Sequence, residues 1–258
     1  MKKSVLLSID VEEFDIPGEY GQIIDENTQF ETSLTGLKAI LVLLDRLELR
    51  ATFFVTANFA IHHEAIIKEI SQNHEIASHG FYHSSFQIED LAKSRNALEQ
   101  IISQSVTGFR MARLMEVDDQ EIRKAGYNYN SSMNPTYIPG RYNNFFKPRS
   151  IYYSNGILNI PVSVTPLIRF PLFWLSFKNL PLSWIKIASQ ITLQHDSYLC
   201  LYFHPWEFTD IHAFQLPSFI KKHSGCEMLH RLEQYLIWLK NKGEFITFSE
   251  FTNGVGSP

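Results

Sequence analysis

The sequence predicts an α/β fold with a single domain built around a parallel sheet. Short β-rich runs alternate with longer segments in which apolar residues recur at helical spacing, which is the pattern of βα units. The chain of 258 residues is 45% hydrophobic and 14% aromatic, so it can bury a self-sufficient core. It contains no internal repeat and no Pro/Gly/Ser-rich linker, which favours one domain over residues 1–258.

Strands are expected wherever a short apolar or β-branched run is bounded by polar or turn residues. They are expected at Ser4–Ile9, Ala51–Val55, Glu75–Ser78, around Gly108, at Ile157–Val162, at Tyr198–Phe203 and near Phe245. The apolar run of the first is broken early by Asp10, so we expect a first strand there and not a signal peptide.

Helices are expected between the strands, where apolar residues recur every three to four positions. The segments are those with Leu34, Leu37, Leu41 and Leu44, around Ala60–Ser71, with Ile88, Leu91, Leu98 and Ile102, and, as the last helix, with Leu229, Leu232, Leu236 and Leu239. Ser84 with Gln87, and Asp118 with Glu121, have capping-box spacing, and Gly126 is placed to end the second of these helices. Residues 128–155 lack any period and predict a long irregular loop, which is usually functional.

Charge and cysteine content narrow the class of protein. The 23 Lys and Arg residues against 27 Asp and Glu residues give a net charge of -4, with no basic excess for a nucleic-acid partner. Cys200 and Cys226 cannot form a disulfide framework, so we expect a reducing compartment and a cytoplasmic protein. No uninterrupted apolar run reaches the length of a membrane span.

Titratable residues follow several of the predicted strands. They are Asp10 and Glu12 after the first strand, His79 and His83 after the third, Arg110 after the fourth, and His204 after Tyr198–Phe203. In a βα barrel the carboxyl ends of the strands converge on one face, so these residues would meet in one site. The H-x-x-x-H spacing suits one metal ion if the backbone turns helically. The alternatives are ordinary hydrogen-bonded histidines and an acidic loop entry at Asp10 and Glu12.

Six motifs, taken in order, resemble the polysaccharide deacetylases with a NodB-like domain, carbohydrate esterase family four. They are SIDVEEF at 8–14, ATFFV at 51–55, HGFYH at 79–83, GFR at 108–110, GYNYNSS at 126–132 and YFHPWE at 202–207. The first motif is similar to the Asp-x-Asp/Glu subgroup, here with Asp-x-Glu. The resemblance implies a distorted, seven-stranded (β/α) barrel that removes an N-acetyl group from a sugar with one divalent metal ion, by expectation Zn²⁺.

The resemblance also implies a role for each site residue. Glu12, His79 and His83 would bind the metal, Asp10 would be the general base, Arg110 would orient Asp10, and His204 would be the general acid. This chemistry fits the residue types, because two neutral imidazoles and one carboxylate leave coordination positions open for water and an amide oxygen. The substrate would be an amino-sugar-containing polysaccharide or its lipid-linked precursor.

One departure from the family pattern bears on activity. Asn130 stands where the family usually has an Asp that supports the catalytic imidazole, and an amide cannot stabilise an imidazolium as a carboxylate does. Asp196 or Glu207 are candidates to take over that role. If neither does, the alternative function is a carbohydrate-binding protein with a degenerate, weakly active site.

The stretch from Leu167 to Ile187 is apolar and contains two Trp residues beside three cations. One interpretation is a helix and loop packed on the barrel or in a homo-oligomer interface. The other is a membrane-surface patch, because Trp, Phe and Leu beside Arg169, Lys178 and Lys186 suit the headgroup boundary. An enzyme that acts on lipid-linked sugars would need such a peripheral membrane contact.

Overall fold

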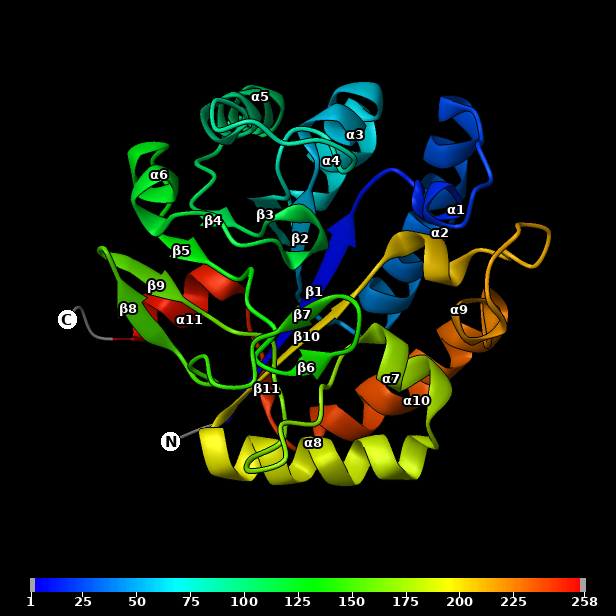
Figure 1. The fold of residues 1–258 in the computed structure, drawn as a ribbon, viewed down its shortest axis with the longest axis vertical. Coiled ribbons are helices and arrows are strands. Elements are labelled where there is room, and N and C mark those ends of the chain that lie inside the picture. Colours follow the sequence, from blue (N-terminus) through cyan, green and yellow to red (C-terminus); the bar gives the residue numbers. More distant parts are fainter. Residues whose placement is uncertain (1–2, 256–258) are drawn as a thin grey trace.

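One curled sheet forms the centre of the computed structural model, which describes residues 3–255 (Figure 1). Its strands are β1 (Ser4–Val11), β2 (Thr52–Val55), β3 (Glu75–Ser78), β4 (Gly108–Phe109), β5 (Tyr129–Asn130), β8 (Tyr152–Ser154), β9 (Ile157–Asn159), β10 (Tyr198–Phe203) and β11 (Glu244–Phe245). They lie in the order β10-β1-β2-β3-β4-β5-β9-β8, with β11 also beside β1. All neighbouring strands from β10 to β9 are parallel, whereas β8 is antiparallel to β9.

The two sides of the curled sheet meet beyond β9. There the amide of Ser163 donates to the carbonyl of Cys200 at 3.0 Å. The amide of Cys200 in turn donates to Ser163 Oγ at 2.9 Å. The predicted α/β fold with a distorted barrel is therefore confirmed: parallel strands curl into a half-barrel whose open side is bridged by these two bonds.

Helices surround the sheet (Figure 1). They are α1 (Ile16–Glu19), α2 (Glu26–Arg46), α3 (Ala57–His62), α4 (Glu64–Ile70), α5 (Asp90–Ile102), α6 (Asp119–Lys124), α7 (Trp174–Asn179), α8 (Leu182–Asp196), α9 (Ser218–Lys221), α10 (Cys226–Lys240), α11 (Phe248–Gly254) and two 3-10 turns, η1 (Ala112–Leu114) and η2 (Pro205–Phe208). Within residues 3–255, no helix is both long and apolar enough to cross a membrane.

Several predicted boundaries are wrong. The helix expected around Ala60–Ser71 is two helices, because His63 leaves helical backbone at φ −131°. The helix expected after Ser84 begins only at Asp90, whose own side chain accepts from the amide of Gln87. The loop expected over 128–155 contains β5, β8 and a hairpin of β6 (Tyr137–Ile138) and β7 (Tyr142–Asn143), and α11 follows the expected last helix.

Alternate side chains of β1 divide the core into an outer and an inner part. Val5, Leu7 and Ile9 pack outward against the helices. Leu6 points into the barrel, where Phe248 of α11 completes an inner apolar cluster. Because side chains alternate along a strand, Ser8, Asp10 and Glu12 continue the inner row toward the carboxyl end. The interior of the barrel is therefore apolar at one end and carries the titratable residues at the other.

Candidate active site and metal centre

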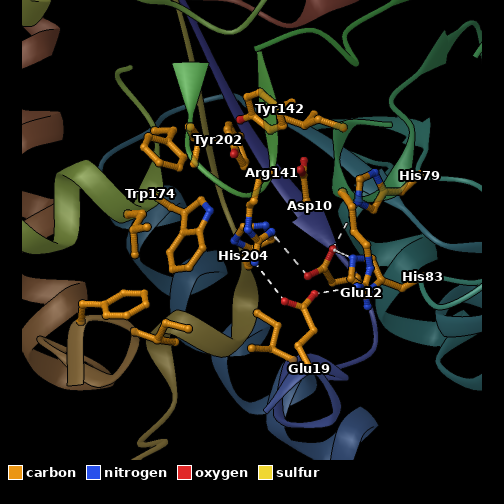
Figure 2. Close-up of a pocket in the computed structure, with 18 of the residues that line it drawn as sticks. Asp10, Glu12, Glu19, His79, His83, Arg141, Tyr142, Trp174, Tyr202 and His204 are labelled. Carbon is orange, nitrogen blue, oxygen red and sulfur yellow. Dashed lines mark hydrogen bonds and ion pairs between the residues drawn. The ribbon is translucent and has the colours of Figure 1, made fainter. Parts of the chain in front are cut away.

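Side chains from the carboxyl ends of β1, β3 and β10 line a cavity of about 280 Å³. They include Asp10, Glu12, His79, His83 and His204. Figure 2 shows Glu12 between the two imidazoles of His79 and His83 on one side and His204 on the other. Arg110, after β4, is fully buried beneath this cavity. The structure thus brings all of the predicted site residues together, and their chemical roles stay predictions.

Glu12, His79 and His83 form a buried three-residue cluster. Glu12 Oε2 lies 3.2 Å from His79 Nε2 and 3.1 Å from His83 Nε2. Three ligand atoms held about 2.1 Å from one tetrahedral ion would lie roughly 3.4 Å apart. These two distances, with all three ligand atoms within 4.8 Å of one another, are compatible with three ligands to one cation.

The other ring nitrogens explain why both Nε2 atoms face Glu12. His79 Nδ1 donates to the carbonyl of Arg110 at 2.9 Å, and His83 Nδ1 donates to Asp15 Oδ1 at 2.8 Å. Such partners fix the ring orientation and leave the Nε2 lone pair available, as is usual for metal-binding histidines. Two oriented imidazoles and one carboxylate are a donor set that fits a bound zinc ion.

The turn after β3 brings the two histidines together without a helix. Residues 79–83 are not helical, so no helical turn places the H-x-x-x-H pair on one face. Instead Gly80 has a φ of +85°, a left-handed conformation that glycine adopts without a steric penalty. The rings of His79 and His83 consequently lie nearly parallel, with their centroids 6.1 Å apart.

Charge in the cluster favours a cation. Burial alone would raise the pKa of Glu12, but the imidazoles of His83 and His204 outweigh it and hold the pKa well below its usual range. Burial would likewise lower the pKa of His83, but the carboxylates of Glu12 and Asp15 raise it to about 10. At neutral pH the metal-free site therefore holds a proton on His83 in the place where a metal ion would sit.

Two residues outside the predicted catalytic and metal-binding set support the ligands. Asp15 orients His83, and the indole of Trp206 donates to Glu12 Oε1 at 3.1 Å. Their positions, just after the first motif and two residues after His204, are the only sequence signals for them. Glu13 turns away from the cavity, where its carboxylate accepts from Thr56 and Asn58.

Arg110 holds Asp10 at the side of the metal cluster. Arg110 Nη1 donates to Asp10 Oδ1 at 2.6 Å and to Ser8 Oγ at 2.7 Å. Its guanidinium also donates to the carbonyl and the hydroxyl of Ser131 and lies 4.0 Å from the ring of Phe54. These bonds fix the position of the Asp10 carboxylate beside the metal cluster.

His204 faces the cluster from β10 and has a carboxylate partner of its own. His204 Nδ1 lies 3.1 Å from Glu207 Oε1, and the backbone amide of His204 donates to the same oxygen at 2.9 Å. The ring of Trp206 stacks on His204, and the ring of Trp174 meets it edge-on. Burial would lower the pKa of His204, but the carboxylates of Glu12 and Glu207 outweigh it and raise the pKa above its ordinary value.

Asn130 does not support His204. Its Nδ2 donates to Asp119 Oδ1 and to Asn159 Oδ1, both at 3.2 Å, and its Oδ1 accepts from Ser132. Asn130 therefore does not take the place of the family's Asp beside the imidazole. Of the two candidate substitutes, Asp196 pairs with Arg149, and Glu207 is the carboxylate that reaches His204.

Comparisons with known proteins agree with this architecture. The family model described as polysaccharide deacetylase matches residues 29–130. A solved structure assigned as a polysaccharide deacetylase from Mycobacterium smegmatis superposes with a TM-score of 0.66 at 17% identity, covering 98% of this chain and 90% of that one. Puue allantoinase superposes with a TM-score of 0.66 at 13% identity, covering 96% and 88%. No curated protein sequence matches the chain.

One further neighbour concerns activity within the family. A CE4 family pseudoenzyme from Bacillus anthracis superposes with a TM-score of 0.53 at 14% identity, covering 96% of this chain and 65% of that one. A mutant of it is described as having restored enzymatic activity. The shared fold by itself therefore does not show whether a protein with this fold is catalytically active.

These findings define first the class of protein, an α/β half-barrel with a buried Glu-His-His cluster at the carboxyl ends of its strands. Residues 29–130 match the family of the polysaccharide deacetylases, hydrolases that act on carbon–nitrogen bonds other than peptide bonds, and the whole chain has a fold similar to theirs. Whether it falls in the Asp-x-Glu subgroup stays a prediction.

We predict that binding of Zn²⁺ at pH 7 releases about one proton, because the imidazolium of His83 must lose its proton to become a ligand. Calorimetric titrations in buffers of different ionisation enthalpy measure this number. Asp15→Asn removes one of the two carboxylates that raise the pKa of His83, so fewer protons should be released. A binding enthalpy that does not depend on the buffer would contradict the prediction.

A second prediction concerns Asn130. Asn130→Asp should lower the free energy of unfolding by about 1–3 kcal/mol. The new carboxylate lacks the Nδ2 group that donates to Asp119 and Asn159, and it faces the carboxylate of Asp119. Urea denaturation measures the change. In the double variant Asn130→Asp with Asp119→Asn, the new amide at 119 can donate to the new carboxylate at 130. The double variant should therefore recover much of the lost free energy of unfolding. A gain in turnover of Asn130→Asp would show instead that this side chain acts on His204.

Proposed function

We propose that the protein is a metal-dependent hydrolase that removes an N-acetyl or other amide-linked acyl group from an amino sugar, in a polysaccharide or in its lipid-linked precursor. The observation that carries the proposal is the convergence of Glu12 Oε2 with the Nε2 atoms of His79 and His83, beside an arginine-held Asp10 and a carboxylate-held His204. When bound, a zinc ion would polarise the amide carbonyl and lower the pKa of a water molecule.

The residues of the chain supply the proton transfers. Asp10 lines the cavity and is held by Arg110, so it can accept the proton of the attacking water as general base. The oxygen atom of that water forms the new bond to the acyl carbon. The carbon–nitrogen bond then breaks, and the departing nitrogen needs a proton because a free amide anion is far too basic to leave.

His204 is placed to give that proton. It faces the cavity across from Asp10, and its elevated pKa keeps more of the acid form at neutral pH. Glu207 holds the ring through Nδ1 and leaves Nε2 directed toward Glu12 and the cavity. An active site with an imidazole supported in this way favours the enzyme over the alternative of a degenerate carbohydrate-binding protein.

The shape of the cavity bears on the substrate. Its volume of about 280 Å³ is at the lower end for ligand pockets, so it suits one acylated sugar unit and not a long stretch of polymer. Trp174, Phe173 and Tyr202 supply aromatic surface against which a sugar ring can pack. At the mouth, Glu19 of α1 pairs with both Arg113 of η1 and Arg141 of the β6–β7 turn, which joins three segments around the entrance.

Cytoplasmic location is part of the proposal. Both cysteines are free thiols, with Cys200 buried and Cys226 exposed, which suits a reducing compartment. Fractionation of cells that produce the chain, with and without a high-salt wash, tests the location.

The proposed activity predicts acetate or formate release from a panel of N-acylated amino sugars, with an acetylated xylan and allantoin as competing substrates. Asp10→Asn should lower turnover by about 10²–10⁴-fold while zinc binding survives, because Asp10 is the base and not the main ligand. His79→Ala should lose both zinc and activity. Glu13→Gln is the matched control, since Glu13 contacts Thr56 and Asn58 outside the cavity. Sugar binding without turnover across the panel would favour the degenerate binder.

The support of His204 by Glu207 predicts a shift in the pH profile. Glu207→Gln removes a carboxylate that raises the pKa of His204, so the acid form is lost at lower pH. The alkaline limb of the kcat profile should move to lower pH, and kcat at neutral pH should fall more than KM changes. An unchanged alkaline limb would show that His204 is not the group that titrates.

A further inference from the structure

An exposed apolar ridge runs along the loop 165–170 and the outer face of α8, the helix that lies along one edge of the molecule (Figure 1). Leu167 is 92% exposed and Phe146 is 91% exposed. The side chains of this α8 ridge are Phe146, Leu167, Ile168, Trp184, Ile187 and Ile191. The predicted packing on the barrel holds for α7, where Phe177 is buried, and for the other face of α8, where Ile185 and Ala188 are buried.

Contacts between its parts make the ridge continuous. The ring of Trp184 meets Phe170 of the loop at 4.2 Å between centroids. The guanidinium of Arg169 lies over the ring of Phe145, which in turn meets Phe146 edge-on. Loop, helix and the segment before β8 therefore form one surface.

The loop is built to project its tip. The amide of Arg169 donates to the carbonyl of Thr165 at 3.2 Å, which closes the loop at its base. Leu167 and Arg169 both have positive φ values, of 65° and 52°, a left-handed conformation that is unfavourable for residues with a side chain. The fold thus maintains a strained backbone that holds two apolar side chains outward in water.

Charge is distributed unevenly along the chain around this ridge. Residues 122–195 contain eight basic residues and no acidic one, although the whole chain has 27 acidic residues and a net charge of -4. Lys147 pairs with Glu116 and Arg149 with Asp196. Arg169, in the loop of the ridge, instead contacts a backbone carbonyl and the ring of Phe145, and Lys186, on α8, lies over the ring of Trp238 in α10. An anionic partner would complement these cations.

The ridge also adjoins the proposed active site. The carbonyl of Arg169 accepts from Thr136 Oγ1 at 2.7 Å, and its Nη1 donates to the carbonyl of Lys147 at 2.6 Å. Thr136 and Lys147 flank the β6–β7 hairpin, whose Ile138 and Tyr142 line the catalytic cavity. Any surface that binds the ridge would therefore also lie near the mouth of the cavity.

We propose that the α8 ridge inserts into the headgroup region of an anionic lipid bilayer. This inference deepens the proposed function, on which it rests, by assigning the substrate to the lipid-linked class. A projecting loop tip flanked by cations suits a lipid surface. A symmetric dimer through the same ridge would bring Arg169 and Lys186 of one copy toward the like charges of the other, which disfavours a second copy as the occupant.

Flotation with phospholipid vesicles tests the proposal. Metal-loaded wild type should bind vesicles of equal parts phosphatidylcholine and phosphatidylglycerol, more weakly at high salt. The double change Leu167→Ser with Ile168→Ser should weaken binding about tenfold or more, because two apolar side chains no longer insert. Lys186→Gln should weaken binding to these vesicles about fivefold and leave binding to pure phosphatidylcholine unchanged. Ile23→Ser, at a site that is 97% exposed elsewhere, is the matched control and should bind like wild type.

Two results would overturn the proposal: wild type that does not float with anionic vesicles, or Ser variants of the loop that float as wild type does. A third such result would come from analytical ultracentrifugation. A wild-type dimer that the loop variant abolishes would assign the ridge to contact with a second copy of the chain. Hydrolysis of a water-soluble acylated amino sugar should be the same in the loop variant and wild type. Vesicle binding without any hydrolysis would refute the proposed function and leave the membrane contact standing.

Discussion

The buried guanidinium of Arg110 is the interaction on which the site depends. A fully buried charge is tolerated only when it is paired and hydrogen-bonded, and Arg110 has both Asp10 and Ser131 as partners. Its bonds join β1, β4 and the end of β5 inside the half-barrel. The carbonyl of the same residue accepts from His79, so one residue fixes the proposed base and orients one proposed metal ligand.

A second buried charge pair organises the opposite wall. Glu207 contacts His204 with one oxygen, and its other oxygen lies 3.8 Å from Lys178 Nζ, with both side chains fully buried. Lys178 and Trp174 both come from α7, so the apolar stretch 167–187 contributes to two surfaces. Its α7 part packs against His204, whereas its loop and α8 face outward. The same stretch therefore contributes both to the wall beside His204 and to the exposed ridge.

Local physics explains which elements were predictable. β1, β2, β3 and β10 are runs of apolar residues buried on both faces of a parallel sheet, and such runs are visible in a sequence. β5 to β8 are strands of only two or three residues, which is too short for a local period to reveal them, and β5 also pairs with strands that are distant in the chain. The start of α5 depends on the side chain of Asp90, which competes with the capping pattern at Ser84.

The sequence by itself determined the α/β fold class and, through six ordered motifs, the residues gathered at the site. It did so because the carboxyl ends of parallel strands meet on one face whatever the loops do. Only the tertiary structure decided which carboxylate reaches His204. Asn130 belongs to β5, five strands from β10 in the sheet, and its amide is held by Asp119 and Asn159. Glu207 reaches the ring instead because η2 turns the chain back on itself directly after β10.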